Sequence, residues 1–255
     1  MTFTVEQFEF YLCILARITA FLYTAPIFNL RNIPQRVKLL FAMLLSFLLF
    51  EILPYEPLSY FTSVGYTVLI GKEVLAGLIM GFFANISFQI LSFSGRLMDM
   101  EIGFSMVTEF DPLTNNQVTI TANFYTYAVT LMFLVTDMHQ IVLRAICDSF
   151  QLIPVGTTII HSEIYTSMLD FLKDFFILGF RIILPMFATI LVINIVLGIL
   201  AKVAPQMNMF VIGLQLKVLV GLTVLIFMIG MLPYVTDFIL EETVEMMKRA
   251  VSYLR

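Results

Sequence analysis

The stretch Phe175–Leu200 reads FFILGFRIILPMFATILVINIVLGIL and contains one charged side chain, that of Arg181. A helix that crosses the hydrocarbon core of a membrane needs about 20 mainly apolar residues. This stretch is long enough and apolar enough to meet that requirement. Pro185 within it predicts a kink in the helix. The stretch therefore indicates a membrane-spanning α-helix.

Further stretches of the same kind lie along the rest of the chain. They are Phe8–Ala25, Val37–Leu53, Val64–Phe93, Asn123–Ile146 and Phe210–Val235. The longer polar stretches between them, Ser94–Thr121 and Gln151–Lys173, are too short to form a soluble domain. The sequence therefore predicts an all-α integral membrane protein, with about six long apolar helices in hairpins and a single domain over residues 1–255.

The composition agrees with a membrane environment. Apolar residues make up 60% of the 255 positions and charged residues 13%, with a mean hydropathy of +0.97. A soluble domain of this length has too little interior to bury so much apolar surface. The 14 Lys and Arg residues form no runs, so nucleic acid is not a predicted partner. Cys13 and Cys147 are isolated in apolar stretches and suggest neither a disulfide framework nor a metal site.

Several charged residues lie inside the predicted spanning helices. Strongly apolar residues each favour insertion by roughly 0.3–0.6 kcal/mol, whereas a central charge opposes it by roughly 2.5–3.5 kcal/mol. The first helix has about eight such apolar residues against Arg17, which is close to break-even. Lys72 and Glu73 burden the third helix, and Arg181 and Lys217 the last two. These helices are better served by protein neighbours or by a wet interior than by lipid alone.

Three interpretations of these charges compete. They could line a transport pathway, form paired contacts that hold helices together, or relay protons. A relay needs a chain of acids or histidines, and the sequence has only two histidines, His139 and His161. We expect Arg17 and Glu73 to form a structural pair between the first and third helices.

Small residues predict close helix packing. Gly77 and Gly81 form a G-x-x-x-G spacing, which lets another helix backbone approach one face of the third helix. Gly213 and Gly221, two turns apart in the last apolar helix, can act in the same way.

The segment Gly103–Asn116 is neither polar enough for a solvent loop nor regular enough for a spanning helix. Irregular backbone at membrane depth is tolerated only where it is buried in protein or lines a cavity. We therefore predict that the segment faces a pore and plugs it when closed. The proposed plug residues are Gly103, Phe104, Met106, Phe110 and Pro112. The alternative is that these side chains only pack against neighbouring helices.

Four segments, taken together, resemble one family of membrane proteins. In order they are Arg31-Asn-Ile-Pro-Gln-Arg-Val-Lys38, Gly71-Lys-Glu73 followed by Gly77 and Gly81, Gly95-Arg-Leu-Met-Asp-Met-Glu-Ile-Gly103 leading to Asp111-Pro112, and Leu197-Gly-Ile-Leu-Ala-Lys-Val-Ala-Pro-Gln-Met-Asn-Met-Phe-Val-Ile-Gly213. The most specific residues are Pro205, Gln206, Met207 and Asn208. The pattern is similar to that of the FliR/SctT family of type III secretion export gates, and most of all to its flagellar branch.

The resemblance implies a subunit of the flagellar protein-export channel. Such proteins join FliP-like and FliQ-like subunits, with an FlhB-like protein as a further partner, in a helical, pseudo-symmetric complex. It lies in the bacterial inner membrane, at the base of the flagellum, and passes unfolded export substrates. Residues 1–174 would be the FliP-like part, and residues 175–255 a FliQ-like hairpin with a C-terminal tail. The resemblance also implies that not every helix is a simple membrane crossing.

Other functions remain alternatives at this point. A small secondary transporter or ion channel would account for the charges, but it predicts internal repeats and broken half-helices at matching positions, which the sequence lacks. A virulence-type secretion homologue would share the quoted segments. The sequence has no zinc-ligand spacing, nucleophile elbow or phosphate-binding glycine loop, so we predict neither an enzyme nor a cofactor.

Overall fold

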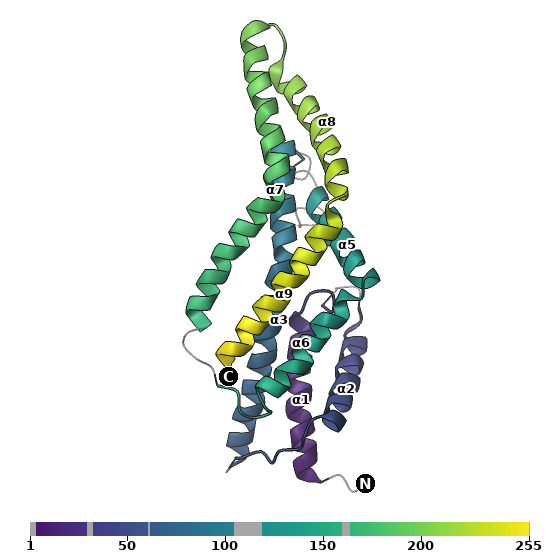
Figure 1. The fold of residues 1–255 in the computed structure, drawn as a ribbon, viewed down its shortest axis with the longest axis vertical. Helices are drawn as coiled ribbons and strands as arrows, with labels where there is room; N and C mark the ends of the chain where they lie inside the picture. Colours follow the sequence, from purple (N-terminus) through teal and green to yellow (C-terminus); the bar gives the residue numbers. More distant parts are fainter. Residues whose placement is uncertain (1–3, 30–32, 61, 105–118, 160–163, 255) are drawn as a thin grey trace. The chain divides into compact units, whose positions relative to one another are not determined.

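The computed structural model describes residues 4–29, 33–60, 62–104, 119–159 and 164–254. The regular elements in these ranges are α-helices, which confirms the all-α fold class. In chain order they are α1 (Val5–Thr24), α2 (Gln35–Ile52), α3 (Ser63–Ile102), α5 (Ile120–Val135), α6 (Met138–Leu152), α7 (Ile164–Val203), α8 (Met209–Ile229) and α9 (Leu232–Leu254) (Figure 1).

Three helices are long and apolar enough to cross a membrane: α3, α7 from Met168 to Val203, and α8. The bent pair α5 and α6 would add a fourth span if it crosses as one. Arg17 lowers the hydropathy of α1, whereas α2 carries three charged residues, Arg36, Lys38 and Glu51, within its 18 residues. The membrane-protein prediction therefore holds with three or four candidate spans among the described residues, fewer than the about six expected.

The predicted span Asn123–Ile146 is broken in its middle. The axes of α5 and α6 differ by 76°. Asp137, at the break, has a left-handed backbone conformation with φ of 58°. Residues other than glycine adopt this conformation only rarely. The Asp137 carboxylate accepts a hydrogen bond from Gln140 Nε2 at 3.1 Å. This polar turn explains why one apolar stretch makes two helices.

Three other helices also differ from the predicted bounds, and of these α7 begins eleven residues before the predicted Phe175, at Ile164. α3 continues nine residues beyond Phe93, to Ile102, because the polar side chains in this part have partners. Ser94 Oγ donates to the carbonyl oxygen of Ile90 at 2.8 Å or of Gly179 at 3.0 Å. The predicted span Phe210–Val235 ends as α8 at Ile229, and α9 follows after a short turn.

The chain divides into two compact units. Unit 1 comprises Met1–Ser87, Asp137–Phe171 and Leu240–Arg255, and unit 2 comprises Phe88–Thr136 and Leu172–Ile239. Helices α3, α7 and α9 each contribute residues to both units.

Unit 1 is built around α1. A capping box begins this helix, because the Thr4 hydroxyl accepts from the Gln7 N–H while the Gln7 side chain accepts from the Thr4 N–H. The ring of Phe10 packs on that of Phe50 in α2, with centroids 6.3 Å apart. The hydroxyl of Tyr60 donates to the Glu9 carboxylate at 2.5 Å, and this bond raises the pKa of Tyr60. The connection between α2 and α3 is thereby fastened to α1.

Unit 2 has an aromatic core. Phe88 in α3 meets Phe133 in α5 edge-on, with centroids 4.9 Å apart. Phe93 contacts three phenylalanines of α7, namely Phe175, Phe176 and Phe180. The part of α7 beyond Phe180 forms a hairpin with α8 (Figure 1), and only 17% and 11% of the most apolar 18-residue stretch of each helix is buried. Most of this apolar surface is therefore available to lipid or to other subunits.

Candidate functional site

Arg17 of α1 and Glu73 of α3 form a fully buried ion pair in unit 1. The Nε of Arg17 donates to Oε2 of Glu73 at 2.6 Å, and both side chains have no exposed surface. The structure thus brings together the two residues that the sequence analysis paired. Breaking such a pair leaves an uncompensated buried charge, which costs about 3–5 kcal/mol.

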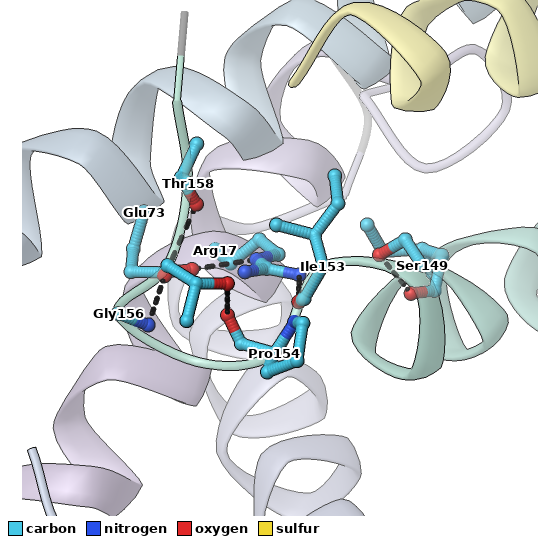
Figure 2. Close-up of polar contacts among 9 residues, drawn as sticks. Arg17, Glu73, Ser149, Ile153, Pro154, Gly156 and Thr158 are labelled. Carbon is cyan, nitrogen blue, oxygen red and sulfur yellow. Dashed lines mark hydrogen bonds and ion pairs between the residues drawn. The ribbon is translucent and has the colours of Figure 1, made fainter. Parts of the chain in front are cut away.

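The turn after α6 completes the cluster. Figure 2 shows that Arg17 Nη1 donates to the Ile153 carbonyl oxygen, at 3.0 Å. Oε1 of Glu73 accepts from the Gly156 N–H at 2.9 Å and from the Thr158 hydroxyl at 3.3 Å. Gly156 has φ of +85°, a conformation that glycine adopts without strain, and the turn can therefore present its N–H to the carboxylate.

An aromatic ring covers the arginine. The Arg17 guanidinium carbon lies 4.2 Å from the centroid of the Phe150 ring, within the range of a cation–π contact. The carboxylate accepts three hydrogen bonds and the cation has an anion, a carbonyl and a ring as neighbours. These contacts fix a pair of charges in place and join α1, α3 and the turn at 153–158.

The predicted glycine spacing lies beside this pair. A Cβ on Gly77 would collide with the Arg17 carbonyl oxygen, and one on Gly81 would collide with the Thr24 side chain. Because Gly77 follows Glu73 by one turn, the close approach of α1 to α3 occurs at the level of the ion pair. The glycine face of α3 is therefore occupied by α1 of the same chain.

The other two predicted glycines contact different elements of unit 2. A Cβ on Gly213 would lie 3.2 Å from Leu197 of α7, and one on Gly221 would lie 2.7 Å from Ile102 of α3. Gly221 therefore tolerates no side chain without a shift, whereas Gly213 is only tightly packed.

The predicted plug is described only at its start. Gly103, with φ of +98°, and Phe104 follow the end of α3. Met106, Phe110 and Pro112 lie outside the described residues.

Asp99 was not singled out by sequence reasoning, although it belongs to one of the quoted segments. Its buried carboxylate accepts from the Thr121 N–H, with both oxygens 3.1 Å away. It thus caps the first turn of α5 from a different helix. One turn earlier on α3, a Cβ on Gly95 would collide with the backbone of Ala122. The end of α3 and the start of α5, which border residues 103–119, are therefore joined to each other.

The Pro205–Asn208 motif forms the turn between α7 and α8. The Met207 N–H donates to the Ala204 carbonyl at 3.1 Å, and the Asn208 side chain accepts from the Val211 N–H at 3.4 Å, capping α8. All four motif residues are exposed. Within the described part of the chain, no three His, Cys, Asp or Glu side chains form a group able to hold a metal ion.

Comparison with known proteins gives a family match over most of the chain. A family model described as bacterial export proteins, family 1, matches residues 8–243. The chain is 30% identical to the flagellar biosynthetic protein FliR of Bacillus subtilis (strain 168), over 99% of this chain and 98% of that protein. It is 31% identical to FliR of Aquifex aeolicus (strain VF5), over 82% and 81%. It is 29% identical to FliR of Pectobacterium carotovorum subsp. carotovorum, over 93% and 91%.

Proposed function

The chain belongs to the family of bacterial export proteins, family 1, and on this basis we propose that it is a membrane component of the flagellar protein-export apparatus. The three relatives described above are all named flagellar biosynthetic proteins, which favours a flagellar over a virulence-type system. A protein of this family is a structural part of the apparatus and not an enzyme. The family match over residues 8–243 is the observation that carries the proposal.

The finer proposal is that the chain is one subunit of a channel core with FliP-like and FliQ-like partners. This core, with an FlhB-like protein beside it, would pass unfolded flagellar proteins across the inner membrane at the base of the flagellum. Residues 1–174 would be the FliP-like part and residues 175–255 the FliQ-like hairpin and tail. The large exposed apolar surface of α7 and α8 supports a role in an assembly. The exposed turn Pro205–Asn208 is available to a partner at the tip of that hairpin.

Copurification tests the assembly. The tagged full chain, expressed with candidate FliP-like and FliQ-like subunits and extracted in mild detergent, should elute as one large hetero-oligomer. Substitution of Met207 and Asn208 by serine should weaken the association, while the helical content stays unchanged. Recovery of the chain as a stable monomer that passes small solutes would contradict the proposal and favour a small transporter or ion channel.

The segment Gly103–Asn116 is proposed to restrict the closed pore. Phe104, Met106 and Phe110 are bulky apolar side chains that suit a barrier to water. Gly103 and Pro112 are backbone breakpoints at which the segment could swing aside. The joining of its two bordering helices by Asp99 and Gly95 would give such an element a fixed base.

Deletion of several residues within 104–116 tests the plug. Assembly should remain intact, because Asp99 and Thr121 lie outside the deletion. The assembled complexes should become permeable to ions, as measured by conductance in planar bilayers. An assembled deletion variant that stays as tight as the wild type would leave the segment with only a packing role.

A further inference from the structure

Unit 1 contains a groove that belongs neither to the proposed plug nor to the α7–α8 hairpin. It has a volume of about 380 Å³ and lies between α6 and the part of α9 that is in unit 1. Met247 and Val251 of α9 are buried and form its floor, whereas Ile141 and Leu152 of α6 are exposed at its rim. The groove is therefore open to an occupant.

Helix α6 carries two rows of side chains on different faces. The first row is buried within unit 1 and includes Val142, Ile146 and Phe150. The second row lines the groove and consists of Ile141, Ala145, Asp148 and Leu152. Its spacing of four, three and four residues is that of a helix seam that packs against another helix. The exposure of its two end residues shows that no described part of the chain covers this seam.

Three charged side chains lie midway along the groove. Arg144 and Asp148 are near the middle of the α6 wall, and Lys248 is near the middle of the α9 wall. All three are exposed, and none forms an ion pair or a hydrogen bond within the part of the chain that the structure describes. The groove thus offers two cations and one anion to its occupant.

Neither lipid nor water alone suits this surface. Against acyl chains the three charges would lack partners, and in water the apolar floor and rim would stay exposed. A phospholipid has its charge at one end of its acyl chains, whereas this groove has its charges in the middle, between apolar residues. A helix of another protein chain can carry apolar and charged side chains on one face, three or four residues apart. Such a helix matches the groove in either environment.

We propose that this groove holds an amphipathic helix of a neighbouring subunit, with one carboxylate placed between Arg144 and Lys248. Apolar side chains one turn before and after the carboxylate would contact Met247 and Val251. Asp148 repels a second carboxylate beside the first, so the partner has a single acid at this level and not an acidic run. The walls are about 10–16 Å long, at about 1.5 Å per residue, which corresponds to about two or three turns of the partner helix.

This inference rests on the proposed function only in taking the neighbour to be a subunit of the export apparatus. It is tested first by capture in the membranes of cells that express the full chain with candidate FliP-like, FliQ-like and FlhB-like subunits. A photoreactive amino acid replaces Leu152, and the captured peptide is sequenced by mass spectrometry. We expect an apolar segment of another subunit with one Asp or Glu within about two helical turns of the cross-link. Capture of phospholipid would overturn the proposal.

Charge exchange assigns the contact. Arg144→Glu with Lys248→Glu should reduce copurification of the captured subunit at least tenfold. Replacement of the captured acid by lysine should then restore copurification with this double variant, a recovery that a misfolded chain could not show. The matched control is Arg36→Glu with Lys173→Glu, two exposed cations outside the groove, which should leave copurification unchanged.

Filling the groove tests its shape without changing a charge. Ala145 is half-buried in the lining, and Ala145→Phe should also reduce copurification at least tenfold, with the helical content by circular dichroism unchanged. If neither Ala145→Phe nor the double charge variant lowers copurification, the groove is not a docking site, whereas the assembly proposal stands. If the captured helix and the charge exchange hold but no FliP-like or FliQ-like subunit binds, the assembly proposal fails and the docking site stands.

Discussion

At the scale of single residues, the buried pair of Arg17 and Glu73 is held by groups from three separate parts of the chain. The carboxylate has one oxygen on Arg17 and the other on the Gly156 N–H and the Thr158 hydroxyl. Because both partners are fully buried, neither can turn to water when the other is removed. The pair therefore acts as a unit.

Removal of either member should destabilise unit 1. Arg17→Ala or Glu73→Ala each leaves a buried charge without its partner, and we expect a loss of about 3–5 kcal/mol. Thermal unfolding in detergent, followed by circular dichroism, measures the loss. The matched control is Arg249→Ala, which breaks the exposed pair of Arg249 and Glu245 and should cost about 0.5 kcal/mol or less. Equal effects of the buried and exposed changes would show that the pair is unimportant.

The charge swap Arg17→Glu with Glu73→Arg should recover only part of that loss. It restores an ion pair between α1 and α3, but an arginine at position 73 would face the Gly156 N–H, a donor that it cannot use. We therefore expect the swapped protein to unfold at a higher temperature than either single variant and at a lower temperature than the wild type. A swap no better than the single changes would contradict direct pairing.

Sequence reasoning could propose this pair because a charge inside an apolar helix needs a partner and few candidates exist. It could not find the turn at 153–158, since the Ile153 carbonyl and the Gly156 N–H are backbone groups with no side-chain signature. The glycine at 156, between two hydrophobic stretches, was the available signal of a left-handed turn. Asp99 was missed for a similar reason, because its partner is the backbone N–H of Thr121.

At the scale of helices, the packing of α1 on α3 depends on small residues. Gly77→Ala would push a methyl group into the Arg17 carbonyl and force the two helices apart, so we expect a lower unfolding temperature. Gly71→Ala, in the same helix with nothing within 4 Å of the added carbon, is the control. It should stabilise the helix by up to about 1 kcal/mol, because alanine favours helix more than glycine does. A change of the unfolding temperature in the same direction for both substitutions would contradict the close approach of α1 to α3 at Gly77.

The start of α5 depends on a carboxylate from α3. Asp99→Ala removes the acceptor of the Thr121 N–H and should cost about 1–2 kcal/mol, as for loss of a helix cap. Asp99→Asn keeps one acceptor oxygen and should cost less. Hydrogen exchange at Thr121 and Ala122 measures the effect locally, with Val129 in the middle of α5 as an internal reference. Unchanged exchange in Asp99→Ala would exclude the capping role.

Helix existence was easier to predict than helix ends. Apolar stretches indicated the helices, but the break at Asp137 could not be read from them, because the apolar residues continue on both sides of it. The continuation of α3 beyond Phe93 was missed since Ser94 and Asp99 look like loop residues until their partners are known. Tertiary partners, absent from a linear reading, decided both cases.

At the scale of the whole molecule, exposed apolar surface and marginal helices indicate a protein that needs neighbours. We expect expression without partner subunits to give aggregation or degradation, and coexpression to raise the yield of folded protein several-fold. Size-exclusion chromatography of detergent extracts measures this. A monodisperse, thermally stable monomer would count strongly against an assembly.

The groups that contact Arg17 are synthesised well after Arg17 itself. Glu73 follows Arg17 by 56 residues in the chain, and the Ile153 carbonyl follows it by 136. At roughly 5–20 residues per second, roughly 7–27 s separate the appearance of Arg17 on the ribosome from that of Ile153. During that interval α1 carries a cation whose neighbours have not all been made, and Glu73 is the first of them to appear. The nascent chain must therefore keep Arg17 hydrated or shielded by the insertion machinery until α3, and then the turn after α6, have been delivered.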